Sequence, residues 1–315
     1  MLVIAALFLH AFLLGGPTAR RLARARWVSG HPQAALRLWH ACAAGLLVSA
    51  TAALVLTAHD LWEHGVVWLF HADEPLVHAV YGGAWQARGI ADAALLALFL
   101  GAVGLSLSAV RRSLRVSRER DRHRLTADAQ GAQDCDEGDP SIRVLRHAAG
   151  SRSRIVVTTA ARDLLSPDQL AATLEHERAH LRLRHHRAIL AADVLTAALG
   201  WTGLRRSYAA QVRRLAEMAA DDRAAHKFGR RTLASALLAM CSAPVPTWSG
   251  EAGALAMTGA DPAERIRRLI AAPSGAAGPL VRALVPAVTA AVLVLPVVLA
   301  LGPAILLFNT AHSGG

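Results

Sequence analysis

The chain has 315 residues, 54% of them hydrophobic, and a mean hydropathy of +0.33. This composition is apolar for a soluble protein, and the length suits a membrane bundle with one further domain of about 130 residues. The formal net charge of +11 is almost all arginine. In a membrane chain such an excess marks the cytoplasmic side, so it does not indicate direct nucleic-acid binding. Three cysteines, an odd number, imply no disulfide framework.

Three apolar segments, at about residues 1–19, 38–58 and 90–110, predict transmembrane helices. Arginines follow the first segment instead of preceding it, which favours a span over the alternative, a cleaved signal peptide. The loop after the second segment is acidic and has no Lys or Arg until just before the third, whereas the other flanks are rich in arginine. The positive-inside rule therefore predicts a cell-membrane protein with residues 17–37 and everything after Arg111 in the cytoplasm.

The predicted outer loop combines histidines with acidic and aromatic residues: His59, Asp60, Trp62, Glu63, His64, Trp68, His71, Asp73, Glu74, His78 and Trp85. Aromatic and histidine side chains are expected at a membrane surface without a specific function. The alternative is a loop that senses metal ions or pH, because imidazole and carboxylate groups bind transition metals and imidazole titrates near neutrality.

A reversal of charge after the third span predicts a domain boundary. Arg111–Arg124 is a basic, helix-like run suited to anionic lipid headgroups, and residues 125–140 are an acidic, glycine-containing stretch expected to be a flexible linker. The predicted domain covers residues 141–278. It opens with two β-branched segments expected to be strands, Ile142–Leu145 and Arg154–Ala160.

The next predicted helix carries the most specific motif of the chain. Its start is marked by SPDQ at residues 166–169: a serine N-cap, a proline at the first helical position, an acid in the first turn and a glutamine placed for a capping box. His176 and His180 are four residues apart, so both imidazoles lie on one helix face and can bind a single zinc ion. Glu177 flanks that face, where its carboxylate can act as a general base on a water molecule.

A catalytic zinc site needs a third protein ligand, and the sequence EMAAD at residues 217–221 provides two candidates. It lies in a long amphipathic stretch, residues 205–228, on which Glu217 and Asp221 share a face. One of these carboxylates can bind zinc while the other accepts the far N–H of a ligating histidine. The alternative is that both pair with arginines on a solvated helix face, namely Arg213, Arg214 or Arg223.

The HExxH motif at residues 176–180, followed by ExxAD at 217–221, resembles the gluzincin pattern. The surrounding sequence, from about residue 155 to 240, is similar to the M56 family of membrane-embedded metallopeptidases, whose best-known members are the BlaR/MecR antibiotic sensors. This resemblance implies an α-helical membrane protein with an inserted cytoplasmic α+β zincin-like protease domain. It also implies the site: zinc ligands His176, His180 and Glu217, catalytic Glu177, and Asp221 as the partner of a ligating histidine.

Two features depart from the M56 pattern. His147–Gly150 lacks the aromatic residue expected before the second strand, which leaves substrate preference open. A fourth apolar segment, Ala283–Phe308, contains three prolines and is followed by a short tail, so residues 279–315 are expected to form the last span with both termini outside. Because no extracellular sensor domain follows, direct β-lactam sensing is not expected.

The segments after the two motifs carry weaker signals. His185 and His186 are expected to face solvent or lipid headgroups instead of binding metal. Ile189–Trp201 is too short to span and suits a buried or membrane-resting helix. Arg223 and His226 are candidates to stabilise an oxyanion, a role that spacing does not assign. Further helices are expected at residues 232–241 and 261–270.

These features predict a membrane-embedded zinc endopeptidase that transduces a signal by cleaving a cytoplasmic protein, such as a transcriptional repressor. Its expected partners are Zn²⁺, the lipid bilayer and that substrate; a homodimer is left open. One alternative is an HtpX-like protease that degrades damaged membrane proteins, and another is a non-catalytic receptor with structural zinc. Glu177 argues against the receptor, because a structural zinc site needs no general base.

Overall fold

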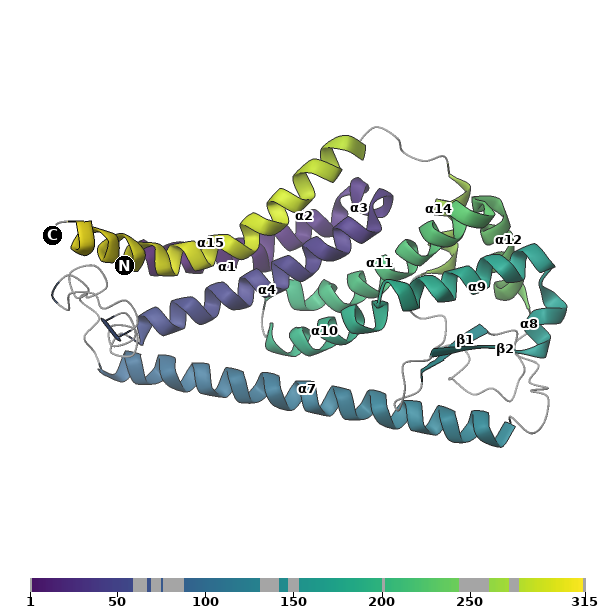
Figure 1. Ribbon diagram of the computed structural model, residues 1–315, viewed down its shortest axis with the longest axis horizontal. Coiled ribbons are helices and arrows are strands. Elements are labelled where there is room, and N and C mark those ends of the chain that lie inside the picture. The colour runs from purple at the N-terminus through teal and green to yellow at the C-terminus, as the bar shows by residue number, and fades with distance from the viewer. Residues whose placement is uncertain are drawn as a thin grey trace.

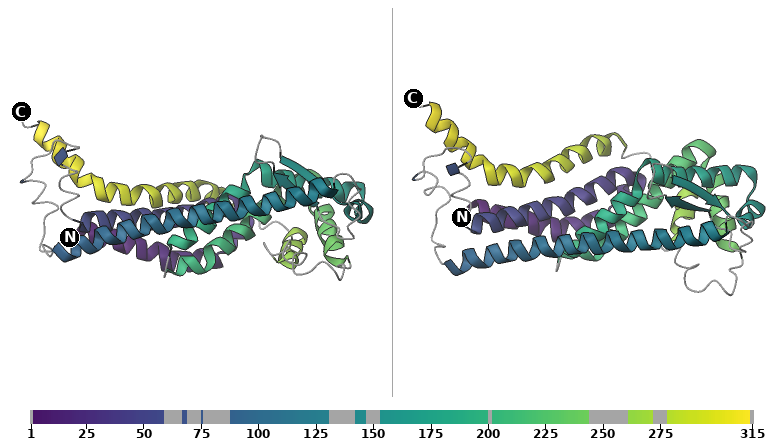
Figure 2. Two further views of the ribbon diagram at one scale, coloured as in Figure 1. Left: turned by 90° about the horizontal axis from the view of Figure 1, so that it is seen from below. Right: turned by 60° about the horizontal axis from the view of Figure 1, so that its bottom comes forward.

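The computed structural model describes residues 2–58, 67–68, 75, 88–130, 142–146, 153–199, 202–243, 261–271 and 278–313. They form an elongated, mostly helical molecule with both chain ends at one extremity (Figure 1). The strands β1 (Ile142–Arg146) and β2 (Ser153–Val157) lie toward the other extremity. Helix α7 (Arg88–Gln130) runs along almost the whole length, as Figure 2 shows from two further directions.

Four helical segments among the described residues are long and apolar enough to cross a membrane: Leu2–Arg24, Pro32–Thr57, Ala93–Arg115 and Val281–Leu306. They confirm the four apolar helices that the sequence predicts. The first segment is longer than predicted, because α1 (Leu2–Leu13) continues through a π-helical turn, η1 (Leu14–Thr18), into α2 (Ala19–Arg24). Pro17 lies in this turn, where a missing N–H is more easily accommodated than in a regular helix.

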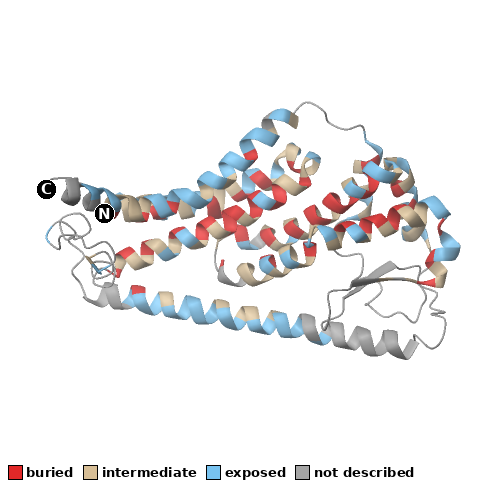
Figure 3. Cartoon of the chain, in the orientation of Figure 1, coloured by how far each residue is buried: buried red, intermediate tan, exposed pale blue. Residues whose placement is uncertain are grey.

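The third and fourth of these segments expose apolar side chains along most of their length. They belong to α7 and to α15 (Gly278–Ser313), both mostly pale blue in Figure 3. The exposed side chains include Leu96, Phe99, Leu100, Leu284, Val298 and Leu306. A continuous apolar surface of this kind is unfavourable in water but suits contact with lipid chains. The surface therefore supports a membrane location for both helices.

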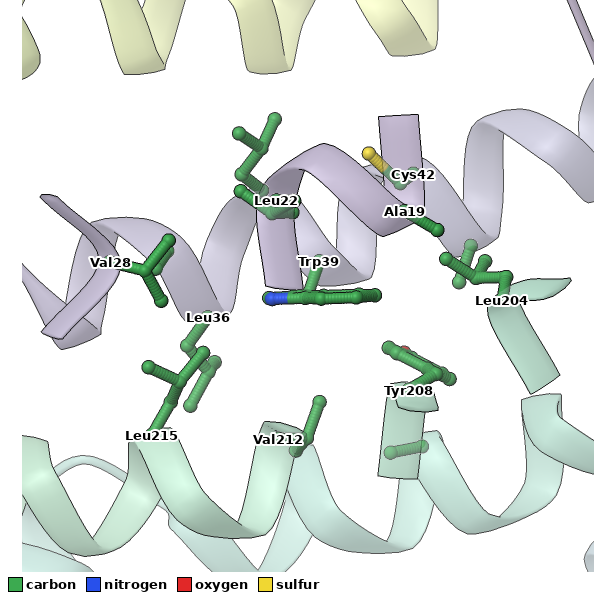
Figure 4. Close-up of a cluster of buried hydrophobic side chains, with 14 of the residues drawn as sticks. Ala19, Leu22, Val28, Leu36, Trp39, Cys42, Leu204, Tyr208, Val212 and Leu215 are labelled. Atoms are coloured by element: carbon green, nitrogen blue, oxygen red, sulfur yellow. The ribbon is translucent and has the colours of Figure 1, made fainter. Parts of the chain in front are cut away.

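Helix α4 (Pro32–Thr57) lies at the centre of the bundle and packs against α1, α15 and α11 (Gly203–Phe228). Trp39 of α4 is fully buried, and its ring stacks on Tyr208 of α11 with centroids 6.5 Å apart. Such an aromatic pair contributes about 0.5 to 1.5 kcal/mol beyond the area that it buries. Figure 4 shows the side chains that converge around it: Ala19, Leu22, Val28, Leu36, Cys42, Leu204, Val212 and Leu215. The first half of α11 is thus part of the same hydrophobic core as α4.

The two strands form an antiparallel pair with Ile142 opposite Val157. Both strands begin within one residue of their predicted starts, but the second was expected to continue to Ala160. It ends at Val157 because Thr158 is the N-cap of helix α8 (Thr159–Leu164), and its hydroxyl accepts a hydrogen bond from a first-turn N–H at 3.2 Å.

The rest of the described domain consists of helices: α9 (Pro167–Arg182), α10 (His185–Ala198), α11, α12 (Arg230–Ser242) and α14 (Pro262–Ile270). Helix α9 packs against α11 and α12, and α12 packs against α14. Helix α10 packs between α7 and α11. It contains most of the segment Ile189–Trp201, which was expected to be buried or to rest on the membrane. This segment contacts the helix of the third apolar segment, α7, on one side and α11 on the other.

Two predicted loop regions are only partly described. Helix α7 continues to Gln130, so the predicted linker begins as helix, and residues 131–140 lie outside the described residues. In the predicted outer loop, Trp68 is exposed. Outside the described residues lie His147–Gly150 and, from that loop, His59, Asp60, Trp62, Glu63, His64, His71, Asp73, Glu74, His78 and Trp85.

Gly45 sets the spacing between α4 and α15, and its substitution tests this packing. A Cβ atom at Gly45 would lie 2.8 Å from the Val292 carbonyl oxygen, which cannot move without displacing α15. We expect Gly45→Ala to lower the free energy of unfolding by about 1 to 3 kcal/mol, measured by thermal unfolding in detergent. Gly101→Ala in α7 is the matched control, because nothing lies within 4 Å of its added Cβ. Equal stability of the two variants would contradict the packing described.

Candidate metal centre

Helix α9 is fixed at its start by the capping box that the sequence predicts. The Ser166 N–H donates to Gln169 Oε1 at 3.0 Å, and the Gln169 N–H donates to the Ser166 hydroxyl at 3.4 Å. These two bonds satisfy N–H groups that a helix start leaves unpaired. The buried face of the helix carries Thr173, His176 and Ala179. The helix start and the packing together orient the HExxH motif toward α11.

Helix α11 brings the second motif to the first. Its first half is buried against α4, and the same helix then continues past α9, where Glu217 and Asp221 face His176. Asp221 is fully buried and Glu217 is partly exposed. The pairing of two motifs far apart in sequence is therefore a result of packing between two rigid helices, each fixed at a point outside the site.

His176, His180 and Glu217 place one ligand atom each within 4.8 Å of one another. The two Nε2 atoms are 3.0 Å apart, and each lies 3.4 Å from one Glu217 carboxylate oxygen. Two ligands of a tetrahedral zinc ion, each about 2.1 Å from the metal, are about 3.4 Å apart. The donor set and its spacing therefore fit zinc, with three protein ligands and one position left for a water molecule or substrate.

Asp221 lies behind His176, as the sequence interpretation proposed. Its Oδ1 is 2.9 Å from His176 Nδ1, on the side of the ring opposite the ligand atom. A carboxylate in this place favours the imidazole form that carries its hydrogen on Nδ1 and leaves Nε2 free to bind metal. Desolvation by burial opposes its charge, yet Arg265 and His176 hold the pKa of Asp221 at about 2.

Arg265 of α14 is a site residue that the sequence interpretation missed. Its guanidinium binds Asp221 through two hydrogen bonds of 2.9 and 2.6 Å and lies 3.1 Å from Glu217. Burial disfavours its charge, but Asp221 and then Glu217 raise the pKa of Arg265 further above its usual range. The only sequence signal was indirect: Asp261 caps a short, strongly amphipathic helix, and Arg265 shares a face with the buried Leu269.

The sequence left open the alternative that the two acidic residues of the EMAAD motif pair with nearby arginines of α11 on a solvated helix face. The observed ion pairs of these arginines are different. Arg213 binds both carboxylate oxygens of Asp193 at 2.7 Å, and Arg214 binds Glu264. Arg223 and His226, the candidates for an oxyanion, are exposed residues of α11 beyond the metal-binding face. Among the described residues, the arginine that reaches Glu217 and Asp221 is Arg265.

The electrostatics of the group match a cation site. Burial opposes a charge on His176, but hydrogen bonds to Asp221 and Glu217 raise its pKa to about 9. Burial also favours a neutral Glu217, yet His176 and His180 hold its pKa well below the usual range. Burial raises the pKa of Glu177, and the two histidines only partly oppose this effect. A metal ion would thus replace a proton on His176.

The expectation that His185 faces solvent or headgroups is wrong. This residue is 1% exposed, and its Nδ1 lies 3.0 Å from Nδ1 of His180. The chain turns sharply at Arg184, which has φ of 54° in the left-handed region, so that α10 starts back beside the end of α9. Burial, with a smaller contribution from His180, lowers the pKa of His185 to about 4. The histidine is therefore neutral near pH 7.

Substitution of Asp221 tests the buried network. The depressed pKa of Asp221 gives a stabilisation that is present above its usual value of 3.8 and is lost as the pH falls through about 2. The shift corresponds to about 2 kcal/mol. Asp221→Asn should lower the free energy of unfolding at pH 7 by about 3 kcal/mol, because the buried Arg265 loses its anionic partner. Unfolding measured between pH 4 and 2 should lose this contribution in the wild type only. An equal pH dependence in both proteins would contradict the network.

Comparison with protein families finds a match within the domain that contains this group. Residues 147–272 match the model of peptidase family M48. The segment includes both helical motifs and Arg265, whereas the M56 resemblance is not confirmed. No curated protein and no solved structure is similar enough to the chain to count as a match. The match supports a metallopeptidase family for this part of the chain.

Proposed function

We propose that the chain is a membrane-embedded zinc endopeptidase with an α+β zincin-like domain at residues 141–278, on the cytoplasmic side. The observation that carries the proposal is the convergence of His176, His180 and Glu217 on one point, with Glu177 on the same helix as the two histidines. The match to family M48, whose members are typically zinc-dependent, supports the same chemistry. The arginine-rich flanks of the spans support the cytoplasmic side.

A zinc ion held by His176, His180 and Glu217 would polarise the scissile carbonyl and acidify the attacking water. Glu177 takes a proton from that water and returns it to the leaving amine. A carboxylate with a raised pKa suits both steps, because it accepts the proton of the water more readily and remains protonated until the leaving amine takes that proton. Asp221 orients His176, and Arg265 balances the charge of the Asp221 and Glu217 carboxylates.

A non-catalytic receptor with structural zinc is less well supported. A structural zinc site is normally closed by four protein ligands, whereas the described group has three. Glu177 is partly buried and interacts electrostatically with His176 and His180 without being part of the group, which supports a role as general base. Neither feature is needed for a structural metal, so both favour an enzyme.

The position of the group relative to the spans bears on the substrate. Arg268 of α14 donates to the Ser29 carbonyl at 2.7 Å and to the Met218 carbonyl at 3.3 Å. Ser29 lies in α3 (Arg26–Gly30), between the first two spans, and Met218 adjoins Glu217. One arginine side chain thus connects the residue next to Glu217 with the short helix between the first two spans. This observation favours a second candidate function, cleavage of membrane-anchored proteins, over cleavage of a soluble repressor.

Two substitutions test the catalytic assignment. Glu177→Gln should keep one zinc per chain and reduce peptide cleavage by at least about 100-fold, because the general base is lost. Glu217→Ala should weaken zinc binding by more than about 100-fold, because a ligand is lost. Zinc is measured by elemental analysis and cleavage with a quenched fluorescent peptide. The matched control is Glu175→Gln on the same helix, where Glu175 binds Arg182 instead. Full activity of Glu177→Gln would contradict the mechanism.

The two substrate classes are separated by one substrate presented in two forms. An unstructured segment is attached to a single span in liposomes with the enzyme, and the same segment is supplied free. We expect tethered cleavage to be at least about tenfold faster, since anchoring raises the effective concentration at the site. Mass spectrometry of the products locates the cuts relative to the span. Equal rates for both forms would favour a soluble substrate.

A further inference from the structure

We propose that His185 is a positioning residue for His180: its Nδ1 accepts the hydrogen bond of His180 Nδ1–H and so keeps His180 Nε2 available as a metal ligand. The inference rests on the proposed zinc site and adds a residue to it. The sequence motifs do not include His185, and its neighbour His186 has the same residue type, so the assignment depends on the geometry of the two rings.

The contact between the two rings determines where the hydrogens lie. The Nδ1 atoms are 3.0 Å apart and the rings are nearly perpendicular, with an interplanar angle of 83°. At this distance one nitrogen must donate and the other accept. A neutral histidine that binds metal through Nε2 carries its hydrogen on Nδ1. His180 is therefore the donor, and His185 is the acceptor with its own hydrogen on Nε2.

The same assignment explains why a histidine is buried at this place. His185 is 1% exposed, and its Nε2 has no hydrogen-bond partner among the described residues. A buried polar atom without a partner costs about 1 to 3 kcal/mol, so an apolar side chain would be more favourable here if packing were the only requirement. The contact with His180 Nδ1 is the polar interaction that compensates for part of this cost.

The chain conformation between the two histidines is what makes the contact. In a continuous helix, residues five apart are separated by about 140° around the axis, so their side chains diverge. Here α9 ends at Arg182, Arg184 adopts a left-handed conformation, and α10 starts at His185. The Arg184 N–H donates to the Leu181 carbonyl at 3.2 Å, which closes the turn. This turn returns His185 to the side of His180.

The two ligating histidines would then have different acceptors. His176 has the Asp221 carboxylate behind it, and His180 has an imidazole. A carboxylate makes the ligand more basic as well as orienting it, whereas an imidazole orients the ring without adding charge. A second carboxylate at this place would add a negative charge beside a group that already contains Glu217. An imidazole acceptor carries no negative charge and avoids this repulsion.

The experiment compares the zinc affinity of full-length variants in detergent, measured by competition with a coloured chelator, with the absorption of the cobalt-substituted proteins. His185→Leu should weaken zinc binding by about 10 to 100-fold. His185→Asn should restore most of the affinity, because its Oδ1 takes the position of the Nδ1 acceptor. His185→Gln, which places its polar group at the Nε2 position, should not. His186→Gln is the neighbouring control and should bind like the wild type.

The outcomes separate this inference from the proposed function. Wild-type affinity in His185→Leu, or equal affinities in the Asn and Gln variants, would overturn the role of His185 and leave the zinc site intact. Absence of zinc binding by the wild type would overturn both. If His185→Leu does not fold, the zinc affinities of His185→Asn and His185→Gln alone decide whether His185 has this role. A changed cobalt absorption in the Leu variant, with the wild-type spectrum in the Asn variant, would support an effect on ligand orientation.

Discussion

The buried carboxylate of Asp221 is the interaction on which the domain depends. It lies on α11, accepts two hydrogen bonds from Arg265 of α14, and lies within hydrogen-bonding distance of His176 on α9. An isolated charge at a fully buried position would be strongly unfavourable, so the arginine and the histidine must both be in place. Three elements from different parts of the sequence are thereby fixed relative to one another. Their common point is His176, one of the three residues of the candidate metal centre.

A second constraint comes from the length of α11. This one helix of 26 residues carries Tyr208, which packs on Trp39 of α4, and Glu217, which belongs to the candidate metal centre. Because an α-helix is stiff over this distance, the position of Glu217 is set by packing inside the bundle as well as by α9. Arg268, which links Met218 to Ser29, adds a polar connection between the same two regions. The candidate metal centre and the bundle of apolar helices are therefore linked by both packing and hydrogen bonds.

The family comparison and the geometry support the same general chemistry while differing from the first functional expectation. The match to M48 supports a metallopeptidase but gives no support for the signalling role that the M56 resemblance suggested. Repressor cleavage would not require the candidate centre to be linked through Arg268 to α3, the short helix between two spans. Proximity to the membrane is a simple physical way to select substrates, because a tethered segment is concentrated near the enzyme.

Much of this protein follows from local patterns. Long apolar runs predicted helices long enough to cross a bilayer, SPDQ predicted a helix start, and two histidines four residues apart predicted a shared helix face. These inferences succeed because each depends on residues within a few turns of one another. Arg265 and His185 escaped them, since a lone arginine or histidine has no local signature. One depends on how α14 packs against α11, and the other on a left-handed turn at Arg184. Contacts between distant segments are set by the packing of whole helices. That packing brings the α11 and α14 residues of the candidate metal centre to the two histidines of α9.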